Sequence, residues 1–206
     1  MTRTRNFLLP IALAASFAVP LAAQGFSEGF AFLKAVRERD GSKVQGMVDN
    51  PSSSVINTRD GKTGEGALHI LVQDRNLEWL AFMLSRGARP DLQSSDGTTP
   101  LGLAAQFGWV EGATQLIARG AKVDQANNRG ETPLILAIQA RQLAVAERVA
   151  MIRLLIAQGA DPRRQDSFAG YSALDYARQD SRTPEILAAL AEEPARAAGA
   201  AIGPNP

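Results

Sequence analysis

Apolar residues recur every three or four positions along most of the chain, in pairs of short segments separated by polar turns. This spacing is typical of helices that bury one side. The first segment of a pair has small residues on one side, as in residues 101–105, whereas the second has a wider apolar stripe, as in residues 79–84 and 149–156. The stretches between pairs are polar and turn-rich, as in residues 124–130. The pattern predicts stacked helix-turn-helix units.

Three sequence markers recur at or close to a spacing of 33 positions. Thr-Pro-Leu begins at Thr99 and again at Thr132, 33 positions later, and a degenerate copy begins 33 positions before Thr99, at Gly66. The second marker is a Gly-Ala pair, which begins at Gly87, Gly120 and Gly159. The third is a turn glycine, at Gly61, Gly97 and Gly130. Independent markers at a single period indicate an array of repeats.

Each marker has a physical role. The Thr hydroxyl can cap the free amides of a first helical turn, and Pro at the next position loses no hydrogen bond because that amide has no partner in the helix. The glycine of each Gly-Ala pair stands where a helix ends in a left-handed residue. The markers therefore predict where the helices begin and end.

The chain resembles the ankyrin repeat. The resemblance is carried by DGTTPLGLAA at residues 96–105, RGETPL at 129–134 and AQGADP at 157–162, and it covers roughly residues 26 to 191. It implies an all-α ankyrin-repeat solenoid of about five helix-turn-helix units with short β-turn fingers. It also implies a concave groove, formed by the finger tips and the exposed side of each first helix, with which members of the family bind proteins.

The units can be placed along the sequence. The repeat domain is expected at residues 24–193, and its units at about 27–58, 59–95, 96–128, 129–165 and 166–193. The first and last lack Thr-Pro-Leu and are expected to be caps; in the first, helices are predicted over residues 30–36 and 44–48. Residues 194–206, rich in Ala, Gly and Pro, are predicted to be a disordered tail.

The fourth unit departs from the period. From Thr99 to Gly120 there are 21 positions, but from Thr132 to Gly159 there are 27, so the fourth unit has six additional residues. They fall near residues 142–148, whose composition favours a helix. We expect extended helices around a longer turn.

The first residues have the order of an export signal. A basic stretch with Arg3 and Arg5 precedes an apolar run, and Leu21-Ala22-Ala23 ends it with small residues. Residues 1–23 are therefore expected to be a signal peptide, cleaved between Ala23 and Gln24, which places the protein in the bacterial periplasm or outside the cell. A retained membrane anchor is the alternative, although the apolar run is short for a span. Lipidation is excluded here because the chain has no cysteine.

Charge and composition narrow the function. Lys and Arg number 22 and Asp and Glu 21; removal of residues 1–23 leaves 20 basic and 21 acidic residues, a net charge of −1. A nearly neutral chain gives no electrostatic reason to bind nucleic acid or an anionic membrane. The single histidine, His69, occupies a position that the resemblance makes structural, with its ring bonded to the backbone of the turn between units. We therefore expect no catalysis, no cofactor and no metal.

The resemblance places the partner-binding residues on the groove. The finger candidates are Lys62, Glu65, Asp96, Thr98, Asn128, Arg129, Glu131 and Tyr171. The helix candidates are Gln73, Asp74, Gln106, Phe107 and Gln139, with Trp109 at the turn between helices. Phe107 and Trp109 are expected anchors for a partner, although local packing is the alternative for both.

The expected function is non-catalytic binding of another protein, of unknown identity, by a monomer that has no contact with membrane after signal cleavage. Two other classes stay open. One is an accessory or chaperone-like factor for a specific periplasmic enzyme or toxin. The other is a small-molecule binder or enzyme, against which stand the single histidine and the absence of cysteine.

Overall fold

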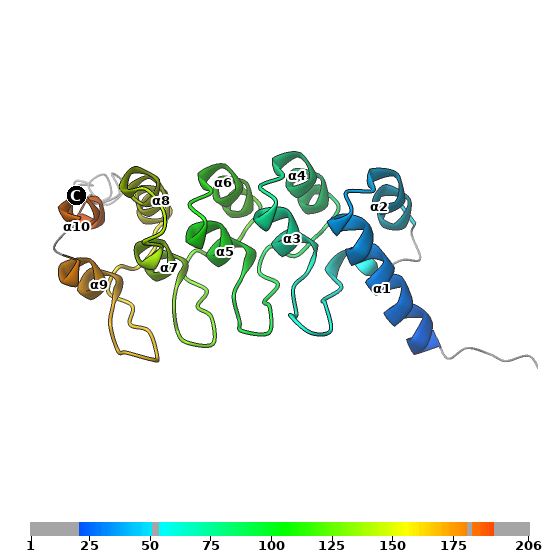
Figure 1. The fold of residues 1–206 in the computed structure, drawn as a ribbon, viewed down its shortest axis with the longest axis horizontal. Helices are drawn as coiled ribbons and strands as arrows, with labels where there is room; N and C mark the ends of the chain where they lie inside the picture. Colours follow the sequence, from blue (N-terminus) through cyan, green and yellow to red (C-terminus); the bar gives the residue numbers. More distant parts are fainter. Residues whose placement is uncertain (1–20, 51–53, 181–182, 192–206) are drawn as a thin grey trace, which may run out of the picture.

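The computed structural model describes residues 21–50, 54–180 and 183–191, with side chains from residue 28 onward. Most of the expected signal peptide and the expected tail lie outside these residues. The described chain consists of ten α-helices and one 3₁₀ turn (Figure 1), with the following bounds: α1 Leu21–Arg37, α2 Gly41–Val48, η1 Val55–Asn57, α3 Ala67–Gln73, α4 Leu77–Ser85, α5 Pro100–Gln106, α6 Val110–Ala118, α7 Pro133–Gln139, α8 Val145–Ala157, α9 Ala173–Gln179 and α10 Pro184–Ala191.

The helices form five consecutive pairs, stacked in one direction (Figure 1). The first helices of the later pairs, α3, α5, α7 and α9, lie in one row, and the second helices, α4, α6, α8 and α10, lie in another. Loops project from the side of the first row between successive pairs. We call the loops at residues 60–65, 94–98, 127–131 and 166–171 fingers 2, 3, 4 and 5, after the unit that each one opens. The expected all-α stack of helix-turn-helix units is confirmed.

The helix starts have the expected chemistry. The Thr99 hydroxyl accepts a hydrogen bond from the backbone N–H of Gly102 at 3.1 Å, and that of Thr132 accepts one from Ile135 at 3.3 Å. Each Thr is followed by a Pro in the first helical turn. Both helices therefore begin where side-chain capping satisfies their free amides.

The first helix is longer than the sequence predicts. It begins at Leu21 rather than near residue 30, so the bond between Ala23 and Gln24 lies in its first turn. The buried side chains that the described part of α1 contributes to the core come later, at Phe32, Leu33 and Val36.

The six additional residues of the fourth unit divide between a turn and one helix. The turn between α7 and α8, residues 140–144, has two residues more than the turn between α5 and α6, and α8 has 13 residues where α6 has nine. The expectation that both helices would lengthen was wrong for α7, which has seven residues like α5. The reason is packing: α7 lies between α5 and α9, which are equally short, whereas α8 extends over α10.

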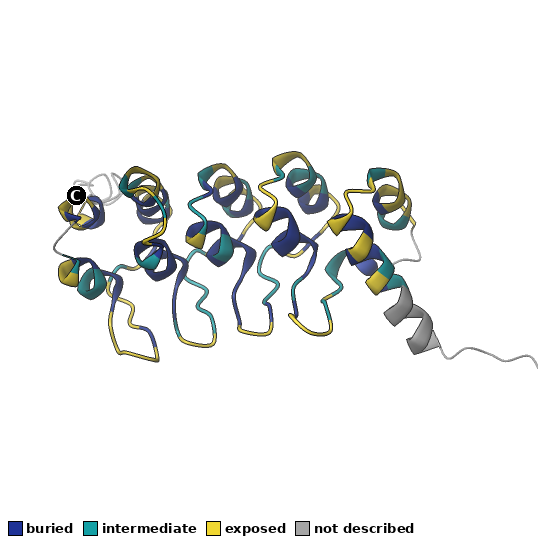
Figure 2. Cartoon of the chain, in the orientation of Figure 1, coloured by how far each residue is buried: buried dark blue, intermediate teal, exposed yellow. Residues whose placement is uncertain are grey.

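The core lies between the two rows of helices (Figure 2). The first row contributes small buried residues, among them Ala104 and Ala137, which let neighbouring units approach closely, and the second row contributes larger ones such as Met83 and Leu116. Among the described residues, no helix has the length and apolar character needed to cross a lipid bilayer.

Candidate functional site

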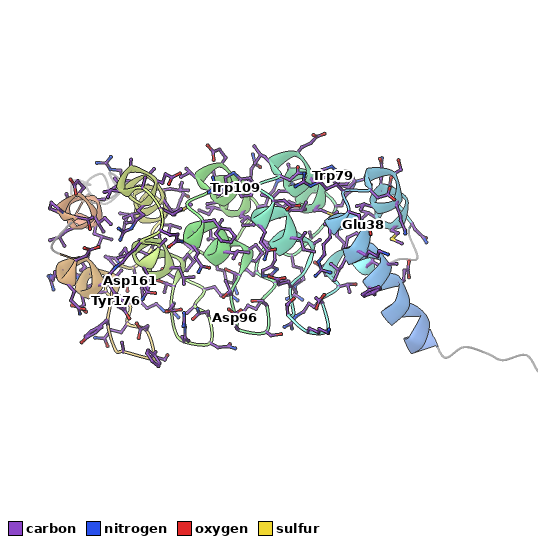
Figure 3. The ribbon with its side chains drawn as sticks, in the orientation of Figure 1. Glu38, Trp79, Asp96, Trp109, Asp161 and Tyr176 are labelled. Atoms are coloured by element: carbon purple, nitrogen blue, oxygen red, sulfur yellow. The ribbon has the colours of Figure 1, made fainter. Side chains whose placement is uncertain are left out.

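The fingers are short hairpins closed by their own backbone. In finger 3 the N–H of Ser94 donates to the carbonyl of Thr98 at 3.0 Å, and in finger 4 the N–H of Asn127 donates to the carbonyl of Glu131 at 3.0 Å. A carboxylate further tightens finger 3, since Asp96 accepts hydrogen bonds from the Ser94 hydroxyl and from the Thr98 backbone and hydroxyl. Figure 3 shows Asp96 on this finger.

Successive fingers are joined to one another by backbone hydrogen bonds. Ser95 N–H donates to the Thr63 carbonyl at 2.8 Å, and Ser167 N–H donates to the Arg129 carbonyl at 2.8 Å. Asn128 N–H bonds the Asp96 carbonyl at 3.0 Å in the same way. The fingers therefore form one continuous, ordered surface beside the first helices.

A hollow of about 270 Å³ lies between fingers 2 and 3 and the first helices α3 and α5. We call it the finger hollow; it is lined by Thr63, Glu65, His69, Ser94, Ser95, Asp96, Thr98, Leu103 and Gln106. Six of these residues carry hydroxyl or carboxylate groups. The expected candidates Glu65, Asp96, Thr98 and Gln106 thus meet at one place.

His69 forms the floor of this hollow and holds two units together. Its Nδ1 accepts the backbone N–H of Gly66 at 3.2 Å, so Nε2 carries the proton and donates to the carbonyl of Thr98 at 3.0 Å. Burial lowers the pKa of the ring below 6.5 and outweighs the hydrogen bond to Thr98. The expected structural role of His69, bonded to backbone between units, is confirmed.

The two carboxylates that line the hollow are also held. Partial burial raises the pKa of Asp96, but the hydrogen bonds from Ser94 and Thr98 outweigh this effect, so the pKa lies below its ordinary value. Glu65 accepts hydrogen bonds from the Gln73 amide at 2.7 Å and from the Thr63 hydroxyl at 3.2 Å. The hollow is thus an ordered polar surface with two negative groups.

Most of the predicted partner-binding residues reach the surface. Eight are exposed: Lys62, Gln73, Asp74, Asp96, Gln106, Asn128, Arg129 and Tyr171. Three are half-buried: Glu65, Phe107 and Gln139. Three are buried, and these need correction: Thr98, Trp109 and Glu131.

Trp109 was expected to be an anchor for a partner, but only 5% of it is exposed, and it lies among the helices (Figure 3). The reason is Gly112, three residues further along α6: a Cβ at that position would meet the indole ring at 2.1 Å. The missing side chain leaves the space that the ring fills. Trp109 therefore stabilises the third unit and is not available to a partner.

Thr98 and Glu131 are buried because they complete their own fingers. The Thr98 carbonyl accepts a hydrogen bond from the His69 ring, and the Thr98 hydroxyl donates one to Asp96 at 2.9 Å. One Glu131 carboxylate oxygen accepts two hydrogen bonds from the Arg129 guanidinium, at 3.0 and 2.7 Å, and a third from Asn127. The prediction that the Glu131 side chain faces a partner was wrong, whereas Thr98, although mostly buried, still lines the finger hollow.

Phe107 occupies an intermediate position. Its side chain packs partly against the core, and its carbonyl accepts a hydrogen bond from the Arg75 guanidinium at 2.6 Å. It does not line the finger hollow. The alternative of local packing therefore accounts for part of its surface.

Sequence reasoning missed Phe168, at the tip of finger 5. Its side chain is 86% exposed, more than any other large apolar side chain among the described residues. The turn is closed beneath it by one carboxylate oxygen of Asp166, which accepts the N–H groups of Phe168, Ala169 and Gly170. The signal was a lone aromatic residue in the turn sequence DSFAG, outside the Thr-Pro-Leu register.

The side chain of Tyr176 also holds finger 5 in place. The Tyr176 hydroxyl donates to Asp166 at 2.6 Å, and burial together with this bond raises the pKa of Tyr176 to about 12. The exposed Tyr171 ring meets the Tyr176 ring edge-on, with 5.6 Å between centroids. An ordered finger thus presents two aromatic side chains, Phe168 and Tyr171, to solvent.

The described residues hold no group of three His, Cys, Asp or Glu side chains with the spacing of a metal site. Residues 68–166 match the family model for ankyrin repeats in three copies, and proteins of this family are typically non-catalytic. The matched stretch contains fingers 3 and 4 together with the helix pairs α3–α4, α5–α6 and α7–α8. This stretch of the chain is therefore an array of ankyrin repeats.

Proposed function

We propose that the chain is exported and then binds a partner protein through its concave groove, the surface that contains the finger hollow. Ankyrin repeats imply a module of protein–protein interaction. The finer parts of the proposal are the surface used, the single partner and the compartment. Each of them rests on its own observation.

The finger hollow is the observation that favours the groove. Its polar side chains come from two neighbouring units and are held by hydrogen bonds, so a partner would meet groups that lose little further freedom on binding. At about 270 Å³, it has the size to receive one or two side chains from a protein surface, and it lies just below the usual range of a small-molecule pocket.

Phe168 and Tyr171, on finger 5, are a second argument that the groove is the binding surface. Exposed aromatic side chains are frequent anchors in protein interfaces because they bury a large area with few rotatable bonds. Finger 5 follows finger 4 in the row of stacked fingers, so the aromatic pair and the finger hollow lie along one face. A partner that spans several fingers would contact both.

The export part of the proposal rests on the signal-like residues 1–23. Loss of these residues would shorten α1 by three residues and leave in place its buried side chains Phe32, Leu33 and Val36. Cleavage is therefore compatible with the folded repeat array. It also gives a sharp test: cell fractionation followed by N-terminal sequencing. A soluble periplasmic or secreted chain that begins at Gln24 is expected, and a chain that keeps Met1 in the membrane fraction would overturn cleavage.

The groove is tested by affinity capture from an extract of the compartment where the protein is found, with short cross-linking. The groove variant is Lys62→Glu with Gln106→Arg, because both side chains are exposed and neither has a side-chain hydrogen bond among the described residues. The matched control is Lys43→Glu with Gln45→Arg, two exposed positions on α2 in the first unit. Both variants change the net charge equally.

One dominant protein captured by the wild type and by the α2 control, and reduced about tenfold with the groove variant, is the expected result. A stoichiometric complex with one enzyme or toxin would identify the chain as its accessory factor. Recovery of the same proteins by all three chains, or of none, would rule out the groove as the binding surface.

A further inference from the structure

A second hollow, of about 690 Å³, lies among the loops that lead from the second helices into the fingers. We call it the basic hollow; it is lined by Asn57, Arg59, Arg89, Pro90, Asp91, Leu92, Gln93, Arg119, Gly120, Lys122 and Gln125. These residues come from the segments after η1, α4 and α6, at equivalent places in three successive units. No residue lines both this hollow and the finger hollow.

Positive charge gathers in the basic hollow. It is lined by three arginines, one lysine and a single acid, Asp91. The Asp91 carboxylate already accepts the backbone N–H of Lys122 at 2.8 Å, and Arg59 donates through Nε to the Gly64 carbonyl at 3.1 Å. Within the described part of the chain, the side chains of Arg89, Arg119 and Lys122 make no ion pair and no hydrogen bond.

The fold does not require these cations. The backbone N–H groups of Arg89, Lys122 and Asp161 occupy equivalent places, and each donates to a side-chain oxygen of the preceding unit, at 2.8, 2.8 and 3.2 Å. The side chain takes no part in this bond, and the fourth unit has an acid there. Any residue with a backbone N–H group could make this bond. The fold therefore gives no reason for the positive side chains of Arg89 and Lys122.

We propose that the basic hollow binds an acidic segment of a partner protein. Aspartate or glutamate side chains of the segment pair with Arg89, Arg119 and Lys122. These cations come from two successive units, so several carboxylates on one segment can pair with them together, which favours a peptide over a simple anion. The surface lies outside the groove, so the inference goes beyond the proposed function and does not depend on it.

Binding is local rather than a property of overall charge. The chain after loss of residues 1–23 has a net charge of −1, so a polyanion gains nothing from the protein as a whole. Attraction within the hollow depends on exposed cations and should therefore weaken as salt shortens the Debye length from about 30 Å at 0.01 M to about 8 Å at 0.15 M.

The test is fluorescence anisotropy of a fluorescein-labelled oligoglutamate peptide titrated with the purified protein at low salt. The hollow variant is Arg89→Gln with Lys122→Gln. The matched control is Arg163→Gln with Arg164→Gln, two exposed arginines of the equivalent loop in the fourth unit, which do not line the hollow. Both variants lose two positive charges, and thermal melts followed by circular dichroism establish that each is folded.

We expect oligoglutamate to bind the wild type and the control alike, oligoglutamine not to bind, and the hollow variant to lose about tenfold in affinity. The groove variant, Lys62→Glu with Gln106→Arg, should bind the peptide as the wild type does, so that failure of the groove and failure of this site are distinguishable.

Three results would overturn the proposal. Equal loss of affinity in the hollow variant and the control would show a general charge effect. If oligoglutamate did not bind the wild type at low salt, the basic hollow would not be a site for an acidic segment. If inorganic phosphate displaced the peptide at the same concentration as the peptide, the hollow would be a phosphate site rather than a peptide site.

Discussion

His69 lies at the joint between the second and third units, and its ring is a hydrogen-bond bridge. One nitrogen accepts the Gly66 N–H and the other donates to the Thr98 carbonyl. The Gly66 N–H is buried and depends on the ring for its partner, whereas the Thr98 carbonyl also accepts hydrogen bonds from the N–H and the hydroxyl of Ser94. In the fifth unit, the Asp175 carboxylate accepts the equivalent N–H, that of Ser172, at 3.0 Å.

Replacement of His69 by Leu should lower the free energy of unfolding by about 1–3 kcal/mol, because the buried N–H of Gly66 loses its partner. Urea unfolding followed by circular dichroism measures the change. Gln73→Ala, on the exposed side of the same helix, should cost less than about 0.5 kcal/mol. Equal losses in the two variants would show that the ring contributes no bridge.

The same residue predicts a pH dependence. Burial lowers the pKa of His69 in the folded chain below 6.5, so the unfolded chain binds the proton first as pH falls. Stability contributed by the neutral ring is therefore complete above about pH 6.5 and decreases below it. Unfolding at pH 7 and pH 5 should show a loss in the wild type that His69→Leu lacks. The pKa of Asp60, lowered to about 2, places its own effect below this window.

At the scale of elements, the fingers behave as a stacked set rather than as separate turns. Gly130 in finger 4 has a φ of +78°, and a Cβ there would meet the backbone N of Ser167 in finger 5 at 2.4 Å. Gly120, after α6, has a similar φ of +88° but open space around it. Substitutions at these two glycines therefore distinguish the effect of backbone strain from the effect of a clash between fingers.

Gly130→Ala should destabilise the protein by about 1–3 kcal/mol more than Gly120→Ala. Both substitutions force alanine into the left-handed region, where the strain is common to the two, and only the first pushes neighbouring fingers apart. Paired thermal or urea unfolding gives the difference directly. Equal destabilisation would mean that finger 5 moves aside at no cost.

The lengthened fourth unit is held by an internal cation. Arg148 of α8 is 3% exposed; it donates to the Ile138 carbonyl at the end of α7 and lies 3.6 Å from the Asp180 carboxylate beyond α9. It thereby connects the long turn of the fourth unit to the last unit. The additional residues thus place a charge where the shorter units have none.

Arg148→Ala should cost about 3 kcal/mol in the free energy of unfolding, because the Ile138 carbonyl and the half-buried Asp180 carboxylate lose a charged neighbour. Arg141→Ala, an exposed arginine of the neighbouring turn, is the control and should be near neutral. The comparison is made by urea unfolding. A near-neutral Arg148→Ala would show that water replaces the guanidinium.

For the whole molecule, each unit contacts only its neighbours, as in other linear repeat arrays. The central pair α5–α6 packs against units on both sides, whereas the last pair, α9–α10, packs on α7 and α8 alone. Stability should therefore decrease toward the C-terminal end. Hydrogen exchange in the native state measures this gradient unit by unit.

Amides of α9 and α10 should exchange faster than those of α5 and α6 under native conditions. Ile186→Ala, which removes a fully buried side chain of α10, should accelerate exchange in the last unit and leave α5 nearly unchanged. Mass spectrometry after peptic digestion locates the protection. Uniform exchange along the chain would show that the array unfolds as one cooperative unit.

Much of the fold could be predicted because its determinants are local. The Thr and Pro at the start of α5 and α7 act within one helical turn, and a period of 33 positions repeats them. The structural role of His69 was implied by the resemblance to the ankyrin repeat. The finger candidates Lys62, Asp96 and Asn128 are exposed because finger tips project from the stack in every unit.

The predictions that were wrong depended on how neighbouring side chains fill space and pair with one another. Trp109 was expected at the surface, but the space beside Gly112 admits its ring; Glu131 was expected to face a partner, but Arg129 and Asn127 hold its carboxylate inside the finger. Burial depends on which side chains fill the space around a residue, and a marker in the sequence does not carry that information.

The sequence by itself determined the repeat, the helix pairs and the positions of the fingers, because capping and helical periodicity act over a few residues. Only the tertiary structure decided which candidates are exposed, how the six additional residues divide between turn and helix, and where charges gather. Arg89, Arg119 and Lys122 are separated along the chain by up to a full repeat and are brought into one hollow by stacking. Stacking places equivalent positions of successive units side by side, and so creates surfaces that no single unit contains.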